Sequence, residues 1–165
     1  MNRVKELRTR YHLSLRDLSS KVNINFSNLS RIERGEIKAF TSTMEKISDF
    51  FNVDMEYIIG KSPIGINVSY DIRNIGKGTI QLNTDELDYF IECGLEEEIT
   101  EHGIVRFVDD SSKAVQILTE KINREQIMQR YDDEYFEKYR RLSPESKATL
   151  SQMIDFFYEK EYGKK

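Results

Sequence analysis

The segment NINFSNLSRIERGE, at residues 23–36, combines a short apolar spacing with many polar and basic side chains. Leu29 and Ile32 are three residues apart, which is the spacing of the buried face of a short helix. The other side chains of this helix would then face away from the core, and most of them are amides, hydroxyls and guanidinium groups. These groups donate and accept hydrogen bonds, and the guanidinium groups carry positive charge. The segment therefore predicts a surface for binding a partner.

Positive charge is concentrated at the same end of the chain. The formal net charge of all 165 residues is −4, which taken alone argues against a polyanionic partner. Residues 1–61, however, contain 11 lysines and arginines against 8 acidic residues, whereas residues 62–165 contain 14 against 21. Within residues 1–38 the counts are 9 and 4. Because a local basic surface matters more to a polyanion than the total charge does, this distribution favours a nucleic-acid partner for the N-terminal part.

The composition sets broad limits on the class of protein. A chain of 165 residues, 38% hydrophobic and 33% charged, suits one domain or two small ones. It has no apolar run of about 18 residues, so no membrane span is expected, and the charged N-terminus lacks a secretion signal. The single cysteine cannot form an internal disulfide, which fits a reducing compartment. We therefore expect a cytoplasmic protein.

Apolar spacing and capping residues predict five short helices in the first sixty residues. Val4, Leu7 and Tyr11 mark one face of a first helix over residues 2–11. Ser14 followed by Asp17 is a start signal for a second helix. The second helix should end near Asn23. Asn25 is expected to cap the third helix and Gly35 to end it. The fourth helix should start at Ser42 and the fifth after Asp54. Short helices joined by tight turns indicate a compact helical bundle.

The segments LSLRDLSSKVNINFSNLSRIERGE and TMEKISDFFNVDMEYIIGK resemble two parts of the lambda-repressor and Cro family. The first resembles the helix-turn-helix of that family, and the second resembles its last two helices. The resemblance covers residues 3–61 in order and register. It implies a five-helix DNA-binding domain over residues 1–61, with residues 15–22 and 26–34 as the two motif helices. In this motif the second helix lies in the major groove with its N-terminal residues at the base edges.

The resemblance also implies which side chains contact DNA. Arg31 is expected to make a bidentate contact to guanine, and Phe26 to touch a thymine methyl group. The residues assigned to base reading are Phe26, Ser27, Asn28, Ser30 and Arg31. The residues assigned to the phosphate backbone are Arg16, Asn25, Arg34 and Lys38. Contacts of this kind position a protein on the duplex but carry no sequence information. Asn25 and Asn28 would both lie near the phosphates or the adjoining base edges, and a solvated position is the simpler interpretation of Asn28.

Three further positions bear on this resemblance. Arg8 and Glu33 occupy positions that pair in some family members, so we expect an ion pair that braces the groove-facing helix. Leu15 stands where many members have a glutamine that binds a phosphate, and leucine cannot make that contact. Taken singly, the basic side chains could also form a solvated surface, and Phe26 could fold back onto the core.

Residues 62–165 are expected to form a smaller α+β or α domain that ends in a long helix. Residues 62–83 predict a linker or a β-hairpin, because INVSYDI alternates, NIGKG is a turn signal and TIQL could return as a second strand. IVRFV could be a third strand, and EEE at residues 96–98 is most simply a solvated run. A helix is expected from Ser112, and DDEYFEKYRRL either continues it or forms a separate helix. Residues 84–165 are interpreted as a dimerisation or regulatory domain.

The last helix carries more apolar side chains than one face needs. It begins at Ser143 and Pro144, a capping serine followed by a proline in the first helical turn. The segment YRRLSPESKATLSQMIDFFYEK is similar to the closing helix of many short phage and mobile-element repressors, whose C-terminal part tends to dimerise or regulate. The residues proposed for a dimer interface are Met153, Ile154, Phe156, Phe157 and Tyr158. Alternatively, this helix closes the core of its own domain.

No pattern in the chain predicts catalysis or a metal or cofactor site. His12 and His102 have no ligand-like spacing to Cys93, which is interpreted as a packing residue near a helix end. The sequence therefore predicts a non-enzymatic, sequence-specific regulator of transcription that binds double-stranded DNA. A homodimeric prophage or mobile-element repressor on a two-fold operator is the first interpretation, with an antirepressor or a protease as a further partner. The alternatives are an antitoxin whose C-terminal part binds a toxin, and an interaction adaptor without DNA affinity.

Overall fold

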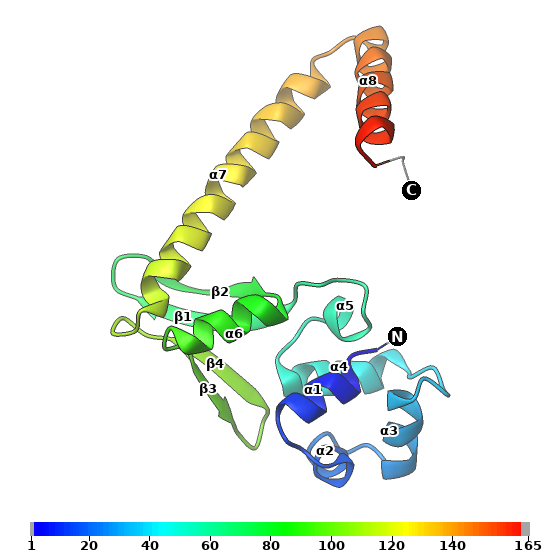
Figure 1. Cartoon of the computed structure of the whole chain (residues 1–165), viewed down its shortest axis with the longest axis vertical. Helices are drawn as coiled ribbons and strands as arrows, with labels where there is room; N and C mark the ends of the chain where they lie inside the picture. Colours follow the sequence, from blue (N-terminus) through cyan, green and yellow to red (C-terminus); the bar gives the residue numbers. More distant parts are fainter. Residues whose placement is uncertain (1, 163–165) are drawn as a thin grey trace. The chain divides into compact units, whose positions relative to one another are not determined.

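The computed structural model describes residues 2–162, apart from the side chains of residues 158, 159, 161 and 162. The chain divides into two compact units, Met1–Thr119 and Glu120–Lys165. Figure 1 shows the order of the helices and strands along the chain.

The first sixty residues form the five expected helices. They are α1 (Val4–Arg10), α2 (Leu15–Lys21), α3 (Phe26–Glu33), α4 (Thr41–Phe51) and α5 (Met55–Ile58). Each of the longer helices contributes large apolar side chains to one buried core. Fully buried members include Leu7, Leu18, Leu29, Ile47, Phe51 and Ile58. This burial supplies most of the stability of helices that are too short to persist alone in water.

The expected helix ends are mostly set by local hydrogen bonds. Ser14 and Asp17 form a reciprocal capping box at the start of α2, and the side chain of Asn25 accepts hydrogen bonds at the start of α3. Asn23, in the turn between them, adopts a φ of 51°, which asparagine tolerates better than most residues. The expectation that Ser42 starts and caps the fourth helix is wrong. Helix α4 begins at Thr41 after Phe40 and has no side-chain cap, so its start depends on the packing of its apolar face.

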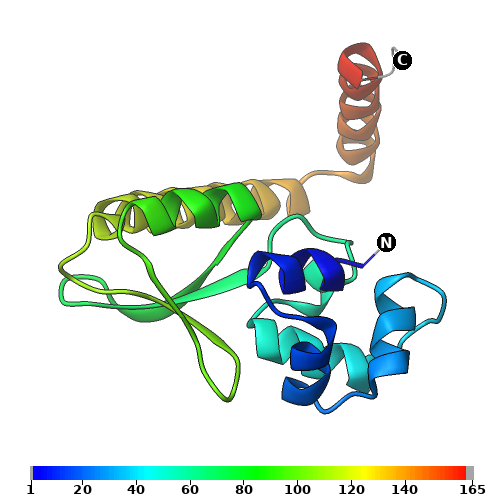
Figure 2. The same cartoon turned by 60° about the horizontal axis from the view of Figure 1, so that its bottom comes forward.

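A four-stranded sheet follows the five helices. Its strands are β1 (Ile66–Ile72), β2 (Gly76–Leu82), β3 (Glu96–Ile99) and β4 (Ile104–Val108), in the order β2-β1-β4-β3. β1 and β2 form an antiparallel hairpin, and β1 pairs in parallel with β4. The parallel pairing requires a crossover, which contains α6 (Thr84–Glu92) and β3. Figure 2 shows α6 lying across one face of the sheet.

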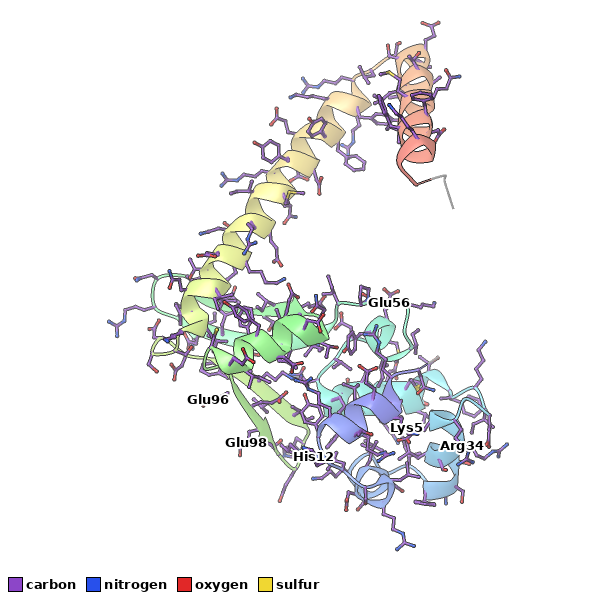
Figure 3. All side chains as sticks on the ribbon, viewed as in Figure 1. Lys5, His12, Arg34, Glu56, Glu96 and Glu98 are labelled. Atoms are coloured by element: carbon purple, nitrogen blue, oxygen red, sulfur yellow. The ribbon has the colours of Figure 1, made fainter. Side chains whose placement is uncertain are left out.

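The acidic run at residues 96–98 is not simply solvated, because it lies in the edge strand β3. Alternate residues of a strand point to opposite faces. Glu96 and Glu98 are exposed, and both are labelled in Figure 3. The side chain of Glu97 is only 18% exposed and pairs with Arg106 on β4. The interpretation as a solvated run failed because the partner of Glu97 comes from another strand.

The buried side chain of Arg106 joins the helices to the sheet. It is 0% exposed and is held by hydrogen bonds from all three guanidinium nitrogens. Nε donates to the carboxylate of Glu97 over 2.7 Å, and Nη2 donates to the hydroxyl of Tyr11 over 2.6 Å. Nη1 donates to the backbone carbonyl of Asn52 over 3.0 Å. Tyr11 follows α1 and Asn52 follows α4, so one charge binds two helix ends to the sheet.

Other contacts also join the helices to the sheet. The Tyr57 and Thr84 hydroxyls are 2.9 Å apart, and the backbone N–H of Asp54 donates to the Gly65 carbonyl over 2.7 Å. A Cβ atom on Gly103 would lie 2.5 Å from the carbonyl oxygen of Phe50. The sheet and its connecting segments therefore pack directly on the helices within the first unit.

Two long helices complete the chain. Helix α7 (Ala114–Arg140) begins in the first unit, where Ala114 and Leu118 are buried, and DDEYFEKYRRL continues it. Helix α8 (Pro144–Tyr162) begins after Ser143, whose hydroxyl accepts a hydrogen bond from the N–H of Ser146. Among the second-unit residues whose side chains are described, none is buried. The dimer candidates Met153, Ile154, Phe156 and Phe157 are exposed, and the side chain of Tyr158 lies outside the described residues.

Replacing Arg106 with methionine is expected to lower the free energy of unfolding by about 3 kcal/mol, because the carboxylate of Glu97 and the Tyr11 hydroxyl lose their common donor. Urea denaturation measures this change. The double variant with Glu97→Gln should recover part of the loss, since a neutral amide replaces a carboxylate that has lost its positive partner and keeps only the Tyr11 hydroxyl. If the double variant lost as much stability as the two single variants together, the pairing would be contradicted.

Stability is expected to fall in alkaline solution through Tyr11. Burial raises the pKa of the Tyr11 phenol to about 12, although the charge of Arg106 opposes the shift. The contribution of a raised pKa is fully present below the unfolded value of about 10 and is lost as pH rises toward 12. Urea denaturation between pH 9 and about pH 12 should therefore show a steeper loss for the natural protein than for Tyr11→Phe. Equal pH slopes would rule out a titration of Tyr11 as the cause.

Candidate nucleic-acid interface

Helix α3 is attached to the bundle by one narrow apolar face. Leu29 is 0% exposed and Ile32 is 3% exposed, and both belong to the core of the N-terminal helices. Leu18 of the preceding helix α2 and Val22, the residue after it, belong to the same core. Because the helix has only eight residues, burying this face turns most of its other side chains outward.

The residues assigned to base reading all lie on α3 and are brought together there. Phe26, Ser27, Asn28 and Arg31 are exposed, and Ser30 is half-buried. Phe26 is 45% exposed and therefore does not fold back fully onto the core. An exposed aromatic ring next to hydroxyl, amide and guanidinium groups matches the apolar and hydrogen-bonding features of base edges in the major groove.

The residues assigned to the phosphate backbone surround α3. Arg16 lies in the first turn of α2, Asn25 and Arg34 are the N-terminal and C-terminal caps of α3, and Lys38 follows in the loop. All four are exposed. Figure 3 shows Arg34 on the outer side of the helical bundle, away from the sheet.

Asn25 has a structural task in addition to any contact with DNA. Its side-chain oxygen accepts hydrogen bonds from the backbone N–H groups of Ser27, over 2.9 Å, and Asn28, over 3.4 Å. These bonds satisfy donors at the start of the helix. A contact from Asn25 to a phosphate would therefore use its NH₂ group, which is a donor.

An ion pair between α1 and α3 braces the outward face of α3. Arg8 donates from Nε to one oxygen of Glu33 over 2.8 Å and from Nη2 to the other over 3.0 Å. Its Nη1 donates to the carbonyl of Leu13 over 2.9 Å. Both charged side chains are mostly covered, at 17% and 6% exposed, so this bidentate pair is better protected than a surface ion pair. Its hydrogen bond to Glu33 raises the pKa of Arg8.

Sequence reasoning missed Glu36, which lies beside two of the assigned arginines. Arg34 donates from Nε and Nη2 to the two oxygens of Glu36, over 2.5 and 3.1 Å. Nε of Arg31 is 3.8 Å from the same carboxylate, and Nη1 of Arg34 donates to the hydroxyl of Ser30. The hydrogen bond from Arg34 lowers the pKa of Glu36. The close spacing of residues 31, 34 and 36 was the available signal.

Two other features of the described surface concern this interface. Phe40, at the start of α4, is 83% exposed, and sequence reasoning did not single it out. Leu15, at the position where the family resemblance implied a glutamine, is half-buried. It packs partly into the bundle and has no group that can hold a phosphate.

Three further observations concern metal ligands, the single cysteine and membrane spans. Within residues 2–162, no three histidine, cysteine, aspartate or glutamate side chains are grouped closely enough to hold a metal ion. Cys93 is the half-buried C-terminal cap of α6. None of the described helices combines the length and apolar character needed to cross a membrane.

Comparisons with known proteins agree with this geometry. Residues 4–58 match the family model of the helix-turn-helix domain. The chain is 27% identical over 120 residues to the HTH-type transcriptional regulator ImmR of Bacillus subtilis (strain 168), an alignment that covers 67% of this chain and 94% of that protein. No solved structure matches the chain significantly. Residues 4–58 therefore form a helix-turn-helix domain of the lambda-repressor type.

Proposed function

We propose that this protein is a sequence-specific transcription regulator that binds double-stranded DNA, and that it acts as a repressor of a prophage or mobile element. The observation that carries the proposal is the arrangement of α3. Leu29 and Ile32 hold the helix to the bundle, and Phe26, Ser27 and Arg31 face outward. The similarity to a curated transcriptional regulator supports the same function. Such a protein would act in the cytoplasm, where its DNA target lies.

In this proposal α3 enters the major groove with its N-terminal residues at the base edges. Arg31 donates two hydrogen bonds to a guanine, and Phe26 contacts the methyl group of a thymine. Arg16, Arg34 and Lys38 bind phosphates and thereby set the position of the helix without reading sequence. The Arg8–Glu33 ion pair keeps α3 in one orientation, because it fixes the last turn of α3 to α1.

We further propose that two copies bind a two-fold operator through equivalent α3 helices. The support is the exposed apolar surface of the second unit. Met153, Ile154, Phe156 and Phe157 are each at least half exposed on α8, and an apolar surface of this kind is typical of a protein interface. A homodimer would place its two reading helices about 34 Å apart, one turn of the duplex.

Selection from random duplex DNA tests the reading helix. The natural protein is expected to enrich one symmetric sequence. Arg31→Ala should relax the preference at one base position in each half-site, because a bidentate guanine contact contributes about 1–3 kcal/mol of discrimination. Lys38→Ala should weaken binding to all duplexes alike, since a phosphate contact carries no sequence information.

The outcomes of this selection separate the interpretations. Enrichment of no sequence by the natural protein would reject the proposed function and favour an adaptor without DNA affinity. An unchanged base preference in Arg31→Ala would remove Arg31 from the set of reading residues. Lys38→Ala is the matched control, because it also removes one positive charge from the exposed surface near α3.

Ile154→Glu is expected to convert a dimer into a monomer, because a carboxylate would have to be buried in the apolar interface. Sedimentation equilibrium measures the change, and the dissociation constant should rise at least about tenfold, for a cost above 1.4 kcal/mol. Gln152→Glu is the matched control. It adds the same charge to an exposed site two residues earlier on α8, a spacing that places it on a different face of the helix. Equal weakening by both variants would argue against an interface at Ile154.

A further inference from the structure

We infer that Glu36 is a specificity-determining residue, which restrains sequence-independent binding of the α3 arginines to DNA phosphates. The inference rests on the proposed function and adds to it a negative charge within the binding surface. It concerns four residues that share hydrogen bonds or close ionic contacts at the end of α3, namely Ser30, Arg31, Arg34 and Glu36.

The backbone holds Glu36 in place. Gly35 adopts a φ of 72°, a left-handed conformation that favours glycine. The N–H of Gly35 donates to the carbonyl of Ile32 over 3.0 Å, and the N–H of Glu36 donates to the carbonyl of Arg31 over 2.9 Å. These two bonds form a Schellman motif, which ends the helix. The position of the carboxylate is therefore set by the helix end and does not depend on its ion pairs alone.

The side chain at this position is unusual for the motif. The residue after the glycine commonly makes an apolar contact with the residue five positions before it, in the last turn of the helix. Here the corresponding residues are Glu36 and Arg31, which have opposite charges and lie 3.8 Å apart. The motif thus places an acidic group on the surface that is proposed to face a polyanion.

The two arginines are affected unequally. Arg34 makes a bidentate pair with Glu36, whereas Arg31 has one longer contact to it. Arg34 is the residue assigned to phosphate, and Arg31 is the residue assigned to a base. A phosphate that binds Arg34 must displace or share the carboxylate, so the pair weakens phosphate contacts more than base contacts. Since phosphate contacts form on every sequence, their weakening increases the ratio of specific to non-specific binding.

The ion pairs of Glu36 are weak enough for DNA phosphates to replace the carboxylate. The side chains of Arg31, Arg34 and Glu36 are about half exposed, at 50%, 54% and 48%. Ion pairs with this exposure are weak, so this replacement is possible, but at a cost of up to about fivefold in affinity. Glu36 therefore lowers affinity without blocking the surface.

Glu36→Gln tests the inference, because it removes the charge and keeps the shape of the side chain. Dissociation constants are measured by fluorescence anisotropy for the selected operator and for a random duplex of the same length, between about 50 and 200 mM salt. The variant is expected to bind the random duplex about two- to fivefold more tightly. The salt dependence should steepen by about one unit, for one more released counterion. Operator affinity should rise less, so the specificity ratio falls.

Two control variants isolate the mechanism. Glu92→Gln makes the same charge change at an exposed site on α6, and it should leave both affinities nearly unchanged. Arg34→Gln combined with Glu36→Gln should lose most of the gain, because the carboxylate acts mainly through Arg34. Thermal denaturation of each variant reports whether it is folded, and the half-exposed position of Glu36 predicts little loss of stability.

Each other outcome counts against the inference. Unchanged affinity for the random duplex in Glu36→Gln would show that the carboxylate does not restrain phosphate binding. A changed base preference would show that Glu36 reads a base directly, and weaker binding to both duplexes would show that it orients the arginines. Failure of the natural protein to bind any duplex would reject the proposed function itself, and the inference with it.

Discussion

The burial of the Arg106 guanidinium is the constraint on which the first unit depends. A buried charge is tolerated only where partners surround it, and here the partners come from separate parts of the chain. Glu97 lies on β3, Tyr11 follows α1 and the Asn52 carbonyl follows α4. The charge is therefore satisfied only when the helices and the sheet have assembled together. The helix-turn-helix domain is consequently packed against the sheet and is not carried on a free linker.

The same helix that meets Arg106 also supports the reading surface. Helix α1 contains Arg8, whose ion pair with Glu33 holds the last turn of α3. Tyr11 follows directly at the end of α1 and accepts a hydrogen bond from Arg106. The sheet is therefore connected with α1 by the Arg106–Tyr11 hydrogen bond, and α1 with α3 by the Arg8–Glu33 ion pair. Both contacts involve charged groups, which form the stronger hydrogen bonds. In the proposed complex, the orientation of α3 would thus depend on residues that are not assigned to DNA contacts.

The surface of α3 combines attraction with restraint. Arg31 and Arg34 give it positive charge, and Glu36 offsets part of that charge at the end of the helix. A surface with positive charge alone would bind phosphates on every sequence, and the genome offers a large excess of such sites. A protein that must find one operator gains from weaker phosphate contacts if its base contacts are kept. The moderate net charge of residues 1–61 fits this balance.

Local features were determined by the sequence alone, and distant partners were decided only by the tertiary structure. The capping box at Ser14, the cap at Asn25 and the left-handed turn at Gly35 were predictable, because their hydrogen bonds join residues at most five apart. The apolar spacing of Leu29 and Ile32 likewise indicated which side of α3 is buried. No local spacing indicated that Arg106 is buried against Glu97 and Tyr11, since Arg106 and Tyr11 are 95 positions apart in the sequence. Spacing in sequence reports on contacts within one helix or strand, whereas the choice of partners between elements depends on how those elements pack.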